Sequence, residues 1–333
     1  MPTTANRRVI AVVLLVPAVV ALALWAFAWP AARIAPRDLP IGVAGPQSAV
    51  ARVEQGLNQR KGAFDVHRYT DEKAARRGIE DRVVYGAVVV APEGPRLLTA
   101  SAAGPAVAQL LQQAVTAQAP AGTPVPVTDV VATPPGDPRG GTLAASVLPL
   151  ALAGVLTGAV VTLLGLRGAR AAAALAGAAV AAGAVGAAMA HSWLGAVTGD
   201  WWAVAGVLTL TVLAIGAGVA GLAALLGRAG LGLGALLVVL LGNAFSGAGS
   251  APELLPEPAG PIGQWLPPGA GVTLLRSVSF FDGAASGPAL LTLSLWSALG
   301  MAAVALGSLR RPATAPGARS ATERPTPQPT PIG

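Results

Sequence analysis

The sequence has 333 residues, of which 53% are hydrophobic and only 11% are charged, and its formal net charge at pH 7 is +7. A soluble domain carries about 25% charged residues, because polar groups must cover its surface. The composition therefore excludes a typical soluble enzyme and a disordered chain, and it indicates a polytopic membrane protein.

Residues 9–29 form the first predicted membrane span. They follow a polar segment, residues 1–8, that ends in two arginines, and they contain no charged side chain. A stretch of this length can cross about 30 Å of hydrocarbon, whereas the apolar core of a signal peptide has only about 7–15 residues. Ala26-Phe27-Ala28 resembles a cleavage site, so a cleaved signal peptide is the alternative to the uncleaved anchor that we expect.

Residues 30–141 differ from the rest of the chain and are predicted to form an extracytoplasmic α/β domain between spans one and two. They hold 12 basic and 10 acidic residues, and segments typical of strands alternate with segments typical of helices. This alternation favours a largely parallel sheet, and a Pro- and Gly-rich linker, residues 134–141, leads back to the membrane. The expected strands are residues 39–44, 64–69, 85–91, 96–100 and 125–131, and the expected helices are residues 47–60, a segment capped by Thr70 and a segment opened by Pro105.

Residues 142–309 are almost wholly apolar and predict five further spans, which gives a polytopic α-helical membrane protein with six spans. Residues 171–190 are nearly all Ala and Gly, so we expect this helix inside the bundle, where small residues allow close approach. Weak Gly-x-x-x-Gly matches at Gly154–Gly158 and Gly230–Gly234 follow the same logic. The five further spans are expected at residues 143–166, 171–192, 202–226, 230–248 and 286–307.

The placement of arginines predicts the topology. One side of the predicted bundle carries nine basic residues and one acidic residue, whereas the loops of the other side carry four acidic residues and one arginine. The positive-inside rule then puts both termini in the cytoplasm and residues 30–141 outside. The positive charge is thus a topology signal, and nucleic acid is not an expected partner. Five tryptophans fall at predicted outer span ends, as an aromatic belt would place them: Trp25, Trp29, Trp193, Trp201 and Trp202.

Residues 249–285 form a long outer segment before the last span. Six prolines prevent a continuous helix up to residue 268, and residues 269–281 then predict a short helix. This helix is too short to span, so it is expected either to lie in the outer interface or to re-enter the membrane. After the last span, the Pro- and Thr-rich tail, residues 310–333, is expected to be disordered and cytoplasmic.

The sequence carries no pattern that predicts an enzyme. It has no cysteine, which excludes thiolate metal sites, and its two histidines, His67 and His191, are far apart. It has no G-x-x-x-x-G-K-S/T, H-E-x-x-H or G-x-S-x-G motif. No Asp, Glu, Lys or Arg lies inside a predicted span, which argues against a proton-driven pump and an intramembrane enzyme. We therefore expect no catalytic residue, cofactor or metal.

Three candidates for a gate or a substrate path follow from these patterns. Asn243 is the most polar residue well inside a predicted span; it either contacts a substrate or, as we prefer, makes an interhelical hydrogen bond. Leu275 lies on the apolar side of the short outer helix. Arg276 is either an outer gate or, preferably, an interfacial arginine near lipid head groups or Asp282. Trp296, near the middle of the last span, is expected to serve packing.

Three stretches together resemble the type-2 ABC exporter permeases of the YhgE/Pip (phage-infection-protein) family, over about residues 5–310. Residues 39–44 (Leu-Pro-Ile-Gly-Val-Ala) resemble the strand that opens the outer domain of that family. Residues 71–92 resemble a second pattern of that family, in which a helix is followed by Tyr-Gly-Ala, an apolar strand and a proline. Residues 263–270, followed by Leu-Leu-Arg at 274–276, resemble its outer loop before the last span, and Trp265 in that loop is the fourth candidate for a gate or a path.

This resemblance implies a permease-like subunit of a homo- or heterodimer in the lipid bilayer, which exports a substrate with a separate ABC ATPase. The eight-residue N-terminal segment and the short loop at residues 167–170 depart from the family, whose cytoplasmic elements engage the ATPase. The alternative is a non-transporting envelope scaffold or receptor whose outer domain binds cell-wall, secreted or phage components.

Overall fold

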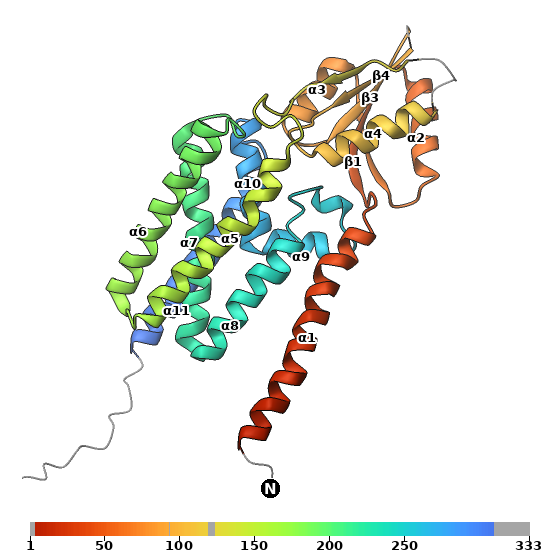
Figure 1. Ribbon diagram of the computed structural model, residues 1–333. Coiled ribbons are helices and arrows are strands. Elements are labelled where there is room, and N and C mark those ends of the chain that lie inside the picture. The colour runs from red at the N-terminus through yellow and green to blue at the C-terminus, as the bar shows by residue number, and fades with distance from the viewer. Residues whose placement is uncertain (1–3, 93, 119–123, 310–333) are drawn as a thin grey trace, which may run out of the picture.

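The computed structural model describes residues 4–92, 94–118 and 124–309, and the tail at 310–333 lies outside these residues. The chain is mostly helical, and five of its helices are long and apolar enough to cross a membrane, which confirms the polytopic helical class (Figure 1). These helices are α1 (Thr4–Ala32), α5 (Gly141–Leu163), α6 (Gly168–Ala187) with its π-helical continuation η1 (Ala188–Trp193), α7 (Trp201–Leu226) and α11 (Gly287–Leu309).

The segment expected as the fifth span is shorter than predicted. It forms α8 (Arg228–Leu236) and the π-helical turn η2 (Leu237–Gly242). At 1.5 Å per residue this helix is roughly 22 Å long, short of the ~30 Å hydrocarbon layer. Helical structure ends at Ala244, and the chain then turns through residues 245–250, where Gly247 has a left-handed φ of 68°.

α7 is the centre of the bundle, and the Ala- and Gly-rich α6 is not, contrary to expectation. In an apolar stretch of 18 residues taken from each helix, 72% of the stretch is buried in α7 but only 22% in α6. Buried positions of α6 recur every fourth residue from Ala171 to Ala187, so a single face packs inward. Small residues around α7 allow neighbours to approach from several sides, which is why α5, α6, α8, α10 and α11 all pack against it.

Both predicted Gly-x-x-x-Gly pairs lie at close helix contacts. On α5, a Cβ atom at Gly154 would lie 2.5 Å from Ile215, and one at Gly158 would lie 2.5 Å from the carbonyl oxygen of Gly216. Gly230 and Gly234 likewise face the backbone of α7. These pairs therefore fix α5 and α8 close against α7.

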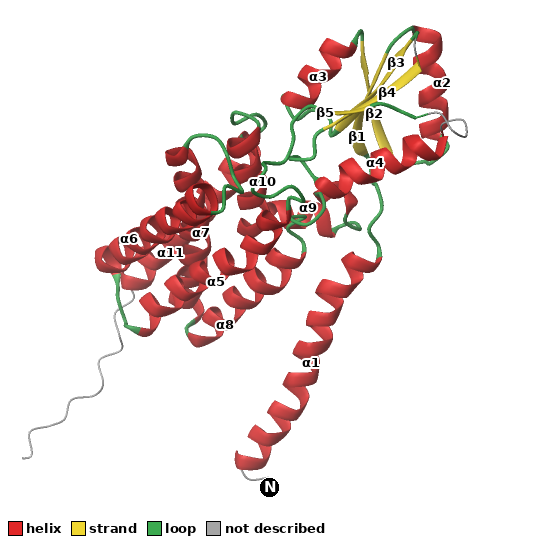
Figure 2. Cartoon of the chain, turned by 45° about the horizontal axis from the view of Figure 1, so that its top comes forward, coloured by secondary structure: helices red, strands yellow, loops and turns green. Residues whose placement is uncertain are grey.

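α1 stands apart from the bundle over most of its length (Figures 1 and 2). Near its C-terminal end, Trp25 and Trp29 stack with ring centroids 5.4 Å apart, and both meet Phe245 edge-on at 6.1 and 6.3 Å. Ala26 and Pro30 in the same stretch are buried, whereas residues 9–22 are exposed in the isolated chain.

Between α1 and α5 the chain forms a five-stranded sheet of order β2-β1-β3-β4-β5. β1 pairs in parallel with β2 and β3, whereas β3 and β4 form an antiparallel hairpin because only two residues separate them. The last pair, β4 with β5, is parallel. The strands are β1 (Leu39–Ala44), β2 (Phe64–Tyr69), β3 (Gly86–Ala91), β4 (Gly94–Thr99) and β5 (Val127–Asp129).

Helices cover both faces of the sheet. α3 (Glu72–Glu80) packs Ala75 and Ile79 on one face, and α4 (Pro105–Gln118) packs Val107 and Leu111 on the other, where α2 (Gln47–Asn58) also lies. We call this sheet with its three helices the sheet unit. The cap of α3 is Asp71, which accepts a 2.7 Å hydrogen bond from the Ala74 amide, so the predicted Thr70 cap is wrong by one residue.

The outer segment after α8 carries η3 (Pro252–Leu254), α9 (Ala259–Trp265) and α10 (Pro267–Phe280). α10 is buried over most of its length. Its Gly271 meets Thr211, the eleventh residue of α7, and the carbonyl oxygen of Trp265 meets Trp296, the tenth residue of α11. The segment thus turns back into the bundle and reaches nearly halfway along two long helices; that it re-enters a membrane there stays a prediction. We call residues 252–280 the re-entrant segment.

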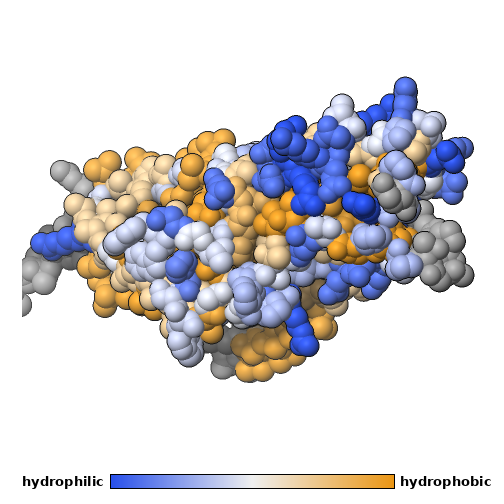
Figure 3. Space-filling model, turned by 90° about the horizontal axis from the view of Figure 1, so that it is seen from above, coloured by the Kyte–Doolittle hydropathy of each residue, from blue (hydrophilic) through white to orange (hydrophobic). Residues whose placement is uncertain are grey.

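The sheet unit lies at the end of the bundle opposite the first helix's N-terminus and the end of α11 (Figure 1). Seen from above, hydrophilic residues gather over the sheet unit and hydrophobic residues over the helices (Figure 3). Ala251 and Leu254 join the core on one face of the sheet, and Phe281 joins the core on the other. The residues that flank the re-entrant segment, Ala251 and Phe281, are therefore built into the sheet unit, as is Leu254 near its start.

Candidate functional site

A polar cavity of about 180 Å³ lies between the sheet unit and the re-entrant segment. Its polar lining comes from two stretches that are far apart in sequence. The sheet unit contributes Arg82 and Tyr85, and the outer segment contributes Glu253, Gln264, Thr273 and Arg276.

The C-terminus of α3 positions Arg82. This residue has a φ of 58°, in the left-handed region, and the Val83 amide donates to the carbonyl oxygen of Gly78 at 2.8 Å. Such a turn commonly ends a helix, although glycine usually occupies the left-handed position. Here the turn directs an arginine side chain from the end of α3 towards α10.

Arg82 joins the sheet unit to α10. Its Nη1 donates to the Thr273 carbonyl oxygen at 3.1 Å and to the Ser277 hydroxyl, and its guanidinium lies 5.2 Å from the ring centroid of Phe281. Burial lowers the pKa of Arg82, and the nearby Tyr85 and Glu253 oppose that shift. Three contacts, with the C-terminal half of α10 and the residue that follows it, thus fix the guanidinium group.

Tyr85 makes the second polar connection. Its hydroxyl donates to Oε2 of Glu253 at 2.8 Å, across the boundary between the sheet unit and the re-entrant segment. Burial, with a further contribution from the Glu253 carboxylate, raises the pKa of the Tyr85 hydroxyl above its ordinary value. The phenol therefore stays protonated at neutral pH and remains a donor.

Arg276 is the most buried charged residue of the cavity, with 3% of its surface exposed. Its Nη2 donates to the Ala248 carbonyl oxygen at 2.6 Å, while its Nε has no hydrogen-bond partner among the described residues. Burial lowers the pKa of Arg276 to about 10; the charge of Arg82 lowers it as well, and Tyr85 and Glu253 oppose the shift. Arg276 is therefore still charged at neutral pH.

Positive charge exceeds negative charge around the cavity. Two guanidinium groups face it, with Glu253 as the one carboxylate among its described lining residues. Within the described part of the chain, no ion pair within 4.0 Å joins Glu253 to Arg82 or Arg276. The arrangement has donors and positive potential in a partly dry space, which is a setting for binding an anion or for fixing the two parts of the chain together.

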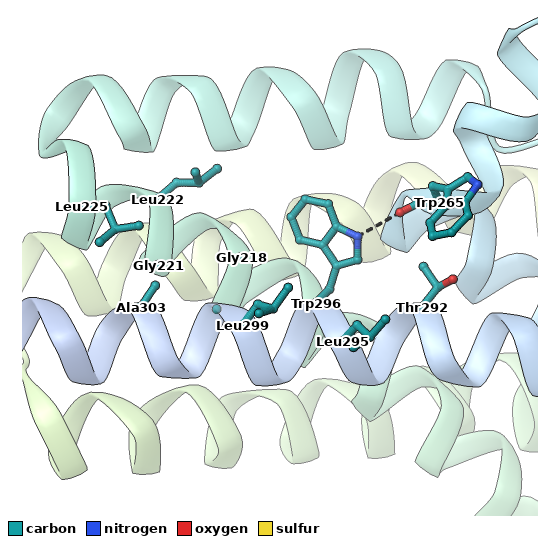
Figure 4. Close-up of a pocket in the computed structure, with 11 residues that line it drawn as sticks. Gly218, Gly221, Leu222, Leu225, Trp265, Thr292, Leu295, Trp296, Leu299 and Ala303 are labelled. Atoms are coloured by element: carbon teal, nitrogen blue, oxygen red, sulfur yellow. Dashed lines mark hydrogen bonds between the residues drawn. The ribbon is translucent and has the colours of Figure 1, made fainter.

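An apolar groove of about 480 Å³ lies on the other side of α9, between α7 and α11 (Figure 4). Gly218 and Gly221 of α7 line it at positions where α11 packs closely, and Leu295 and Leu299 of α11 line it as well. Nε1 of Trp296 donates to the Trp265 carbonyl oxygen at 2.9 Å, so this tryptophan, expected to serve packing, both lines the groove and holds α9.

The four sequence candidates fall in different places. Arg276 lines the polar cavity, where the sheet unit covers it, and no ion pair within 4.0 Å joins it to Asp282 among the described residues; a place near lipid head groups stays a prediction. Trp265, 72% exposed, lines the apolar groove. Leu275 is buried in the bundle core with residues of α7 and α11, and Asn243 is a half-buried residue at the end of η2 whose carbonyl oxygen accepts from the Ser246 hydroxyl at 2.8 Å.

Sequence reasoning missed Arg82, Tyr85, Glu253 and Gln264 as members of one site. Arg82 lies just before a predicted buried strand, and Tyr85 is the first residue of that strand. Their partners lie more than 160 residues away, and no periodicity or short motif connects them. Only the packing of the re-entrant segment under the sheet unit brings them together.

Comparison with protein-family models, curated proteins and solved structures found no match for the chain.

Proposed function

We propose that the protein is the membrane-spanning subunit of a type-2 ABC exporter, which moves a substrate across the cytoplasmic membrane with a separate ATPase. In this proposal both termini are cytoplasmic, and the sheet unit, within residues 30–141, is extracytoplasmic. Support comes from the apolar helices, the arginine asymmetry and the family resemblance of residues 39–44, 71–92 and 263–276. A dimer of such subunits is part of the proposal, because α1 leaves a long apolar face uncovered in the single chain.

The observation that carries the proposal is the position of α10. It packs against α7 at the centre of the bundle, and its C-terminal half is held to the sheet unit by the hydrogen bonds of Arg82 and by the packing of Phe281. A displacement among the long helices would therefore be passed to the outer end of the chain, as a transport cycle requires. The apolar groove beside Trp265 supplies a lateral surface next to the same segment.

The source of energy follows from what the long helices lack. Apart from the arginines of α1 before Val9 and Arg170 in the first turn of α6, the five long helices as described contain no Asp, Glu, Lys or Arg. Ion-coupled transporters keep ionisable groups deep within their spans, whereas the one histidine of these described helices, His191, lies at the end of the α6–η1 span. ATP hydrolysis by a partner is therefore the proposed energy source.

The experiment is purification of the tagged chain from its native membranes in mild detergent. We expect a protein with a G-x-x-x-x-G-K-S/T loop to copurify, together with vanadate-sensitive ATP hydrolysis. The double variant Arg167→Glu/Arg170→Glu, at the proposed cytoplasmic loop, should lose this partner, whereas the matched pair Arg52→Glu/Arg60→Glu in the sheet unit should keep it. Hydrolysis equal to that of a mock eluate would count against the exporter.

One observation favours a second candidate, a non-transporting envelope scaffold or receptor. The proposed cytoplasmic connections are very short, because α5 ends at Leu163 and α6 begins at Gly168, while Gly227 alone separates α7 from α8. These turns offer little surface to an ATPase. Copurification of an envelope protein without any nucleotide-binding partner would support this second function.

A further inference from the structure

We propose that the polar cavity between Arg82 and Arg276 binds a phosphate-type oxyanion, either free inorganic phosphate or the head group of an anionic phospholipid. This proposal does not depend on transport, because binding can be measured on the purified chain whatever its role in the membrane.

The cavity has room for such a group. Its volume of about 180 Å³ is several times the ~30 Å³ share of one liquid water molecule. Its lining is mixed in character: apolar side chains such as Ile79 and Val84 lie beside the two guanidinium groups. The apolar part of this lining strengthens charge-assisted hydrogen bonds formed beside it.

Arg276 supplies an unused donor. It is almost fully buried, and its Nε–H has no acceptor among the described residues, although Nη2 of the same group donates to Ala248. A buried N–H without an acceptor is costly, so a structure that retains one calls for an explanation. A guanidinium group presents a planar fork that matches two oxygens of a phosphate.

Arg82 supplies a second cation that is already held in place. Its bonds to Thr273 and Ser277 and its position over Phe281 fix the guanidinium before any ligand arrives. Such preorganisation reduces the entropy lost on binding. Two arginines approaching one space from different elements form the usual arrangement for an oxyanion rather than for a neutral ligand.

The remaining lining residues neutralise only part of this charge, because Glu253 is one carboxylate against two guanidinium groups. Glu253 is engaged by the Tyr85 hydroxyl and forms no ion pair within 4.0 Å with either arginine in the described structure. Gln264 accepts from the Thr273 hydroxyl at 2.7 Å and is itself uncharged. An oxyanion would restore the charge balance.

The two sources of the oxyanion can be distinguished by experiment, because an apolar surface lies next to the polar cavity along the chain. Trp265 follows Gln264 in the chain and lines the apolar groove, so an apolar surface suited to an acyl chain begins one residue from the polar cavity. A lipid would use both surfaces, whereas free phosphate would use the cavity alone.

The experiment measures binding of radiolabelled inorganic phosphate to the full chain in detergent by equilibrium dialysis. We expect saturable binding that weakens at least about tenfold in Arg276→Gln and in Arg82→Gln, as truncation of a buried charged partner does. Arg52→Gln, which removes an equal charge from an exposed helix position, should bind as the wild type does.

A variant that binds phosphate more tightly is also needed, because a loss of binding can result from misfolding. Glu253→Gln removes the carboxylate of the cavity while its amide oxygen can still accept from Tyr85. This variant should bind phosphate several-fold more tightly than the wild type, which loss of structure cannot imitate.

The second arm uses nanodiscs of phosphatidic acid or phosphatidylcholine and scores lipid retained after purification by native mass spectrometry. Retention of phosphatidic acid that falls in Arg276→Gln, but not in Arg52→Gln, would identify the lipid as the source, and phosphate binding alone would identify the free ion. The proposal is overturned if the wild type and Arg276→Gln do not differ in either arm, or if Glu253→Gln fails to tighten the binding that is observed.

Discussion

Gln264 and Trp265 are consecutive residues of α9, yet they line two different spaces: Gln264 the polar cavity under the sheet unit, and Trp265 the apolar groove between α7 and α11. Both are tied to neighbouring elements, because Gln264 accepts from Thr273 of α10 and the Trp265 carbonyl oxygen accepts from Trp296 of α11. A shift of α9 would therefore change both spaces at once. α9 therefore connects conformational changes in the bundle with changes at the sheet unit.

The bond between Tyr85 and Glu253 should contribute measurably to stability. Tyr85→Phe removes the donor and leaves the Glu253 carboxylate without its partner, a change that costs about 1–3 kcal/mol for a buried acceptor. We expect a lower thermal unfolding midpoint for the full chain in detergent, followed by intrinsic tryptophan fluorescence.

Tyr69→Phe is the matched control for that variant. The Tyr69 hydroxyl has no hydrogen-bond partner in the described part of the chain, so its loss should change stability by less than about 0.5 kcal/mol. Equal midpoints for the two variants would show that the Tyr85 bond does not hold the sheet unit to the re-entrant segment.

Leu275 should tolerate substitution poorly, because it lies in the bundle core rather than against lipid. Leu275→Ala should destabilise by about 2–5 kcal/mol, as buried Leu-to-Ala changes do. Leu275→Asp should abolish folded protein, since an unpaired buried carboxylate costs more still. Leu306→Ala, at an exposed position of α11, should leave the yield of monodisperse protein unchanged, and similar yields for Leu275→Ala and Leu306→Ala would refute the core position.

The close contact of α5 with α7 predicts opposite outcomes for two glycine-to-alanine changes. In Gly158→Ala the new Cβ would meet the Gly216 carbonyl oxygen at 2.5 Å, and such overpacking costs about 1–3 kcal/mol. In Gly177→Ala on α6 nothing lies within 4 Å, so the better helix propensity of alanine should leave stability unchanged or raised by up to ~1 kcal/mol. Thermal midpoints would contradict this packing if Gly158→Ala were the more stable variant.

The proposed topology can be read from single cysteines in this cysteine-free chain. Lys61→Cys, exposed in the sheet unit, should react with an impermeant thiol reagent in intact cells. Ala229→Cys, exposed beside the turn between α7 and α8, should react only after the membrane is permeabilised. Reaction of Ala229→Cys from outside would reverse the orientation inferred from the arginines.

Much of the local structure follows from the sequence pattern. The strands at 39–44 and 64–69 have the predicted bounds. β1 is a continuous apolar run, as expected for a parallel strand buried on both faces, whereas β2 is an edge strand with Asp65 and Arg68 exposed. Composition was a weaker guide to packing: small residues allow close contact in α6, but they do not say which helix is central, and α7 takes that place. Apolar composition likewise predicted a full span where a glycine- and serine-rich stretch after η2 ends the helix.

The candidate site was visible in the sequence only at Arg276. Its partners Arg82 and Glu253 look like ordinary surface charges, one at a helix end and one in a proline-rich segment. Their encounter depends on a long-range fold in which the outer segment sends Ala251 and Phe281 into opposite cores of the sheet unit. Such pairings carry no local signal, so the sequence pattern of either stretch could not predict them.

The central claim is that helix movements during a transport cycle are transmitted through α9 and α10 and change the polar cavity. The measurement is the rate at which Gln264→Cys reacts with an impermeant thiol reagent in right-side-out vesicles, with and without internal ATP and vanadate, beside Lys61→Cys as control. We predict that trapping the nucleotide state changes the rate at position 264 and leaves the rate at position 61 unchanged. Equal rates at position 264 in both states, in vesicles whose trapped ATPase is shown to be bound, would contradict the claim.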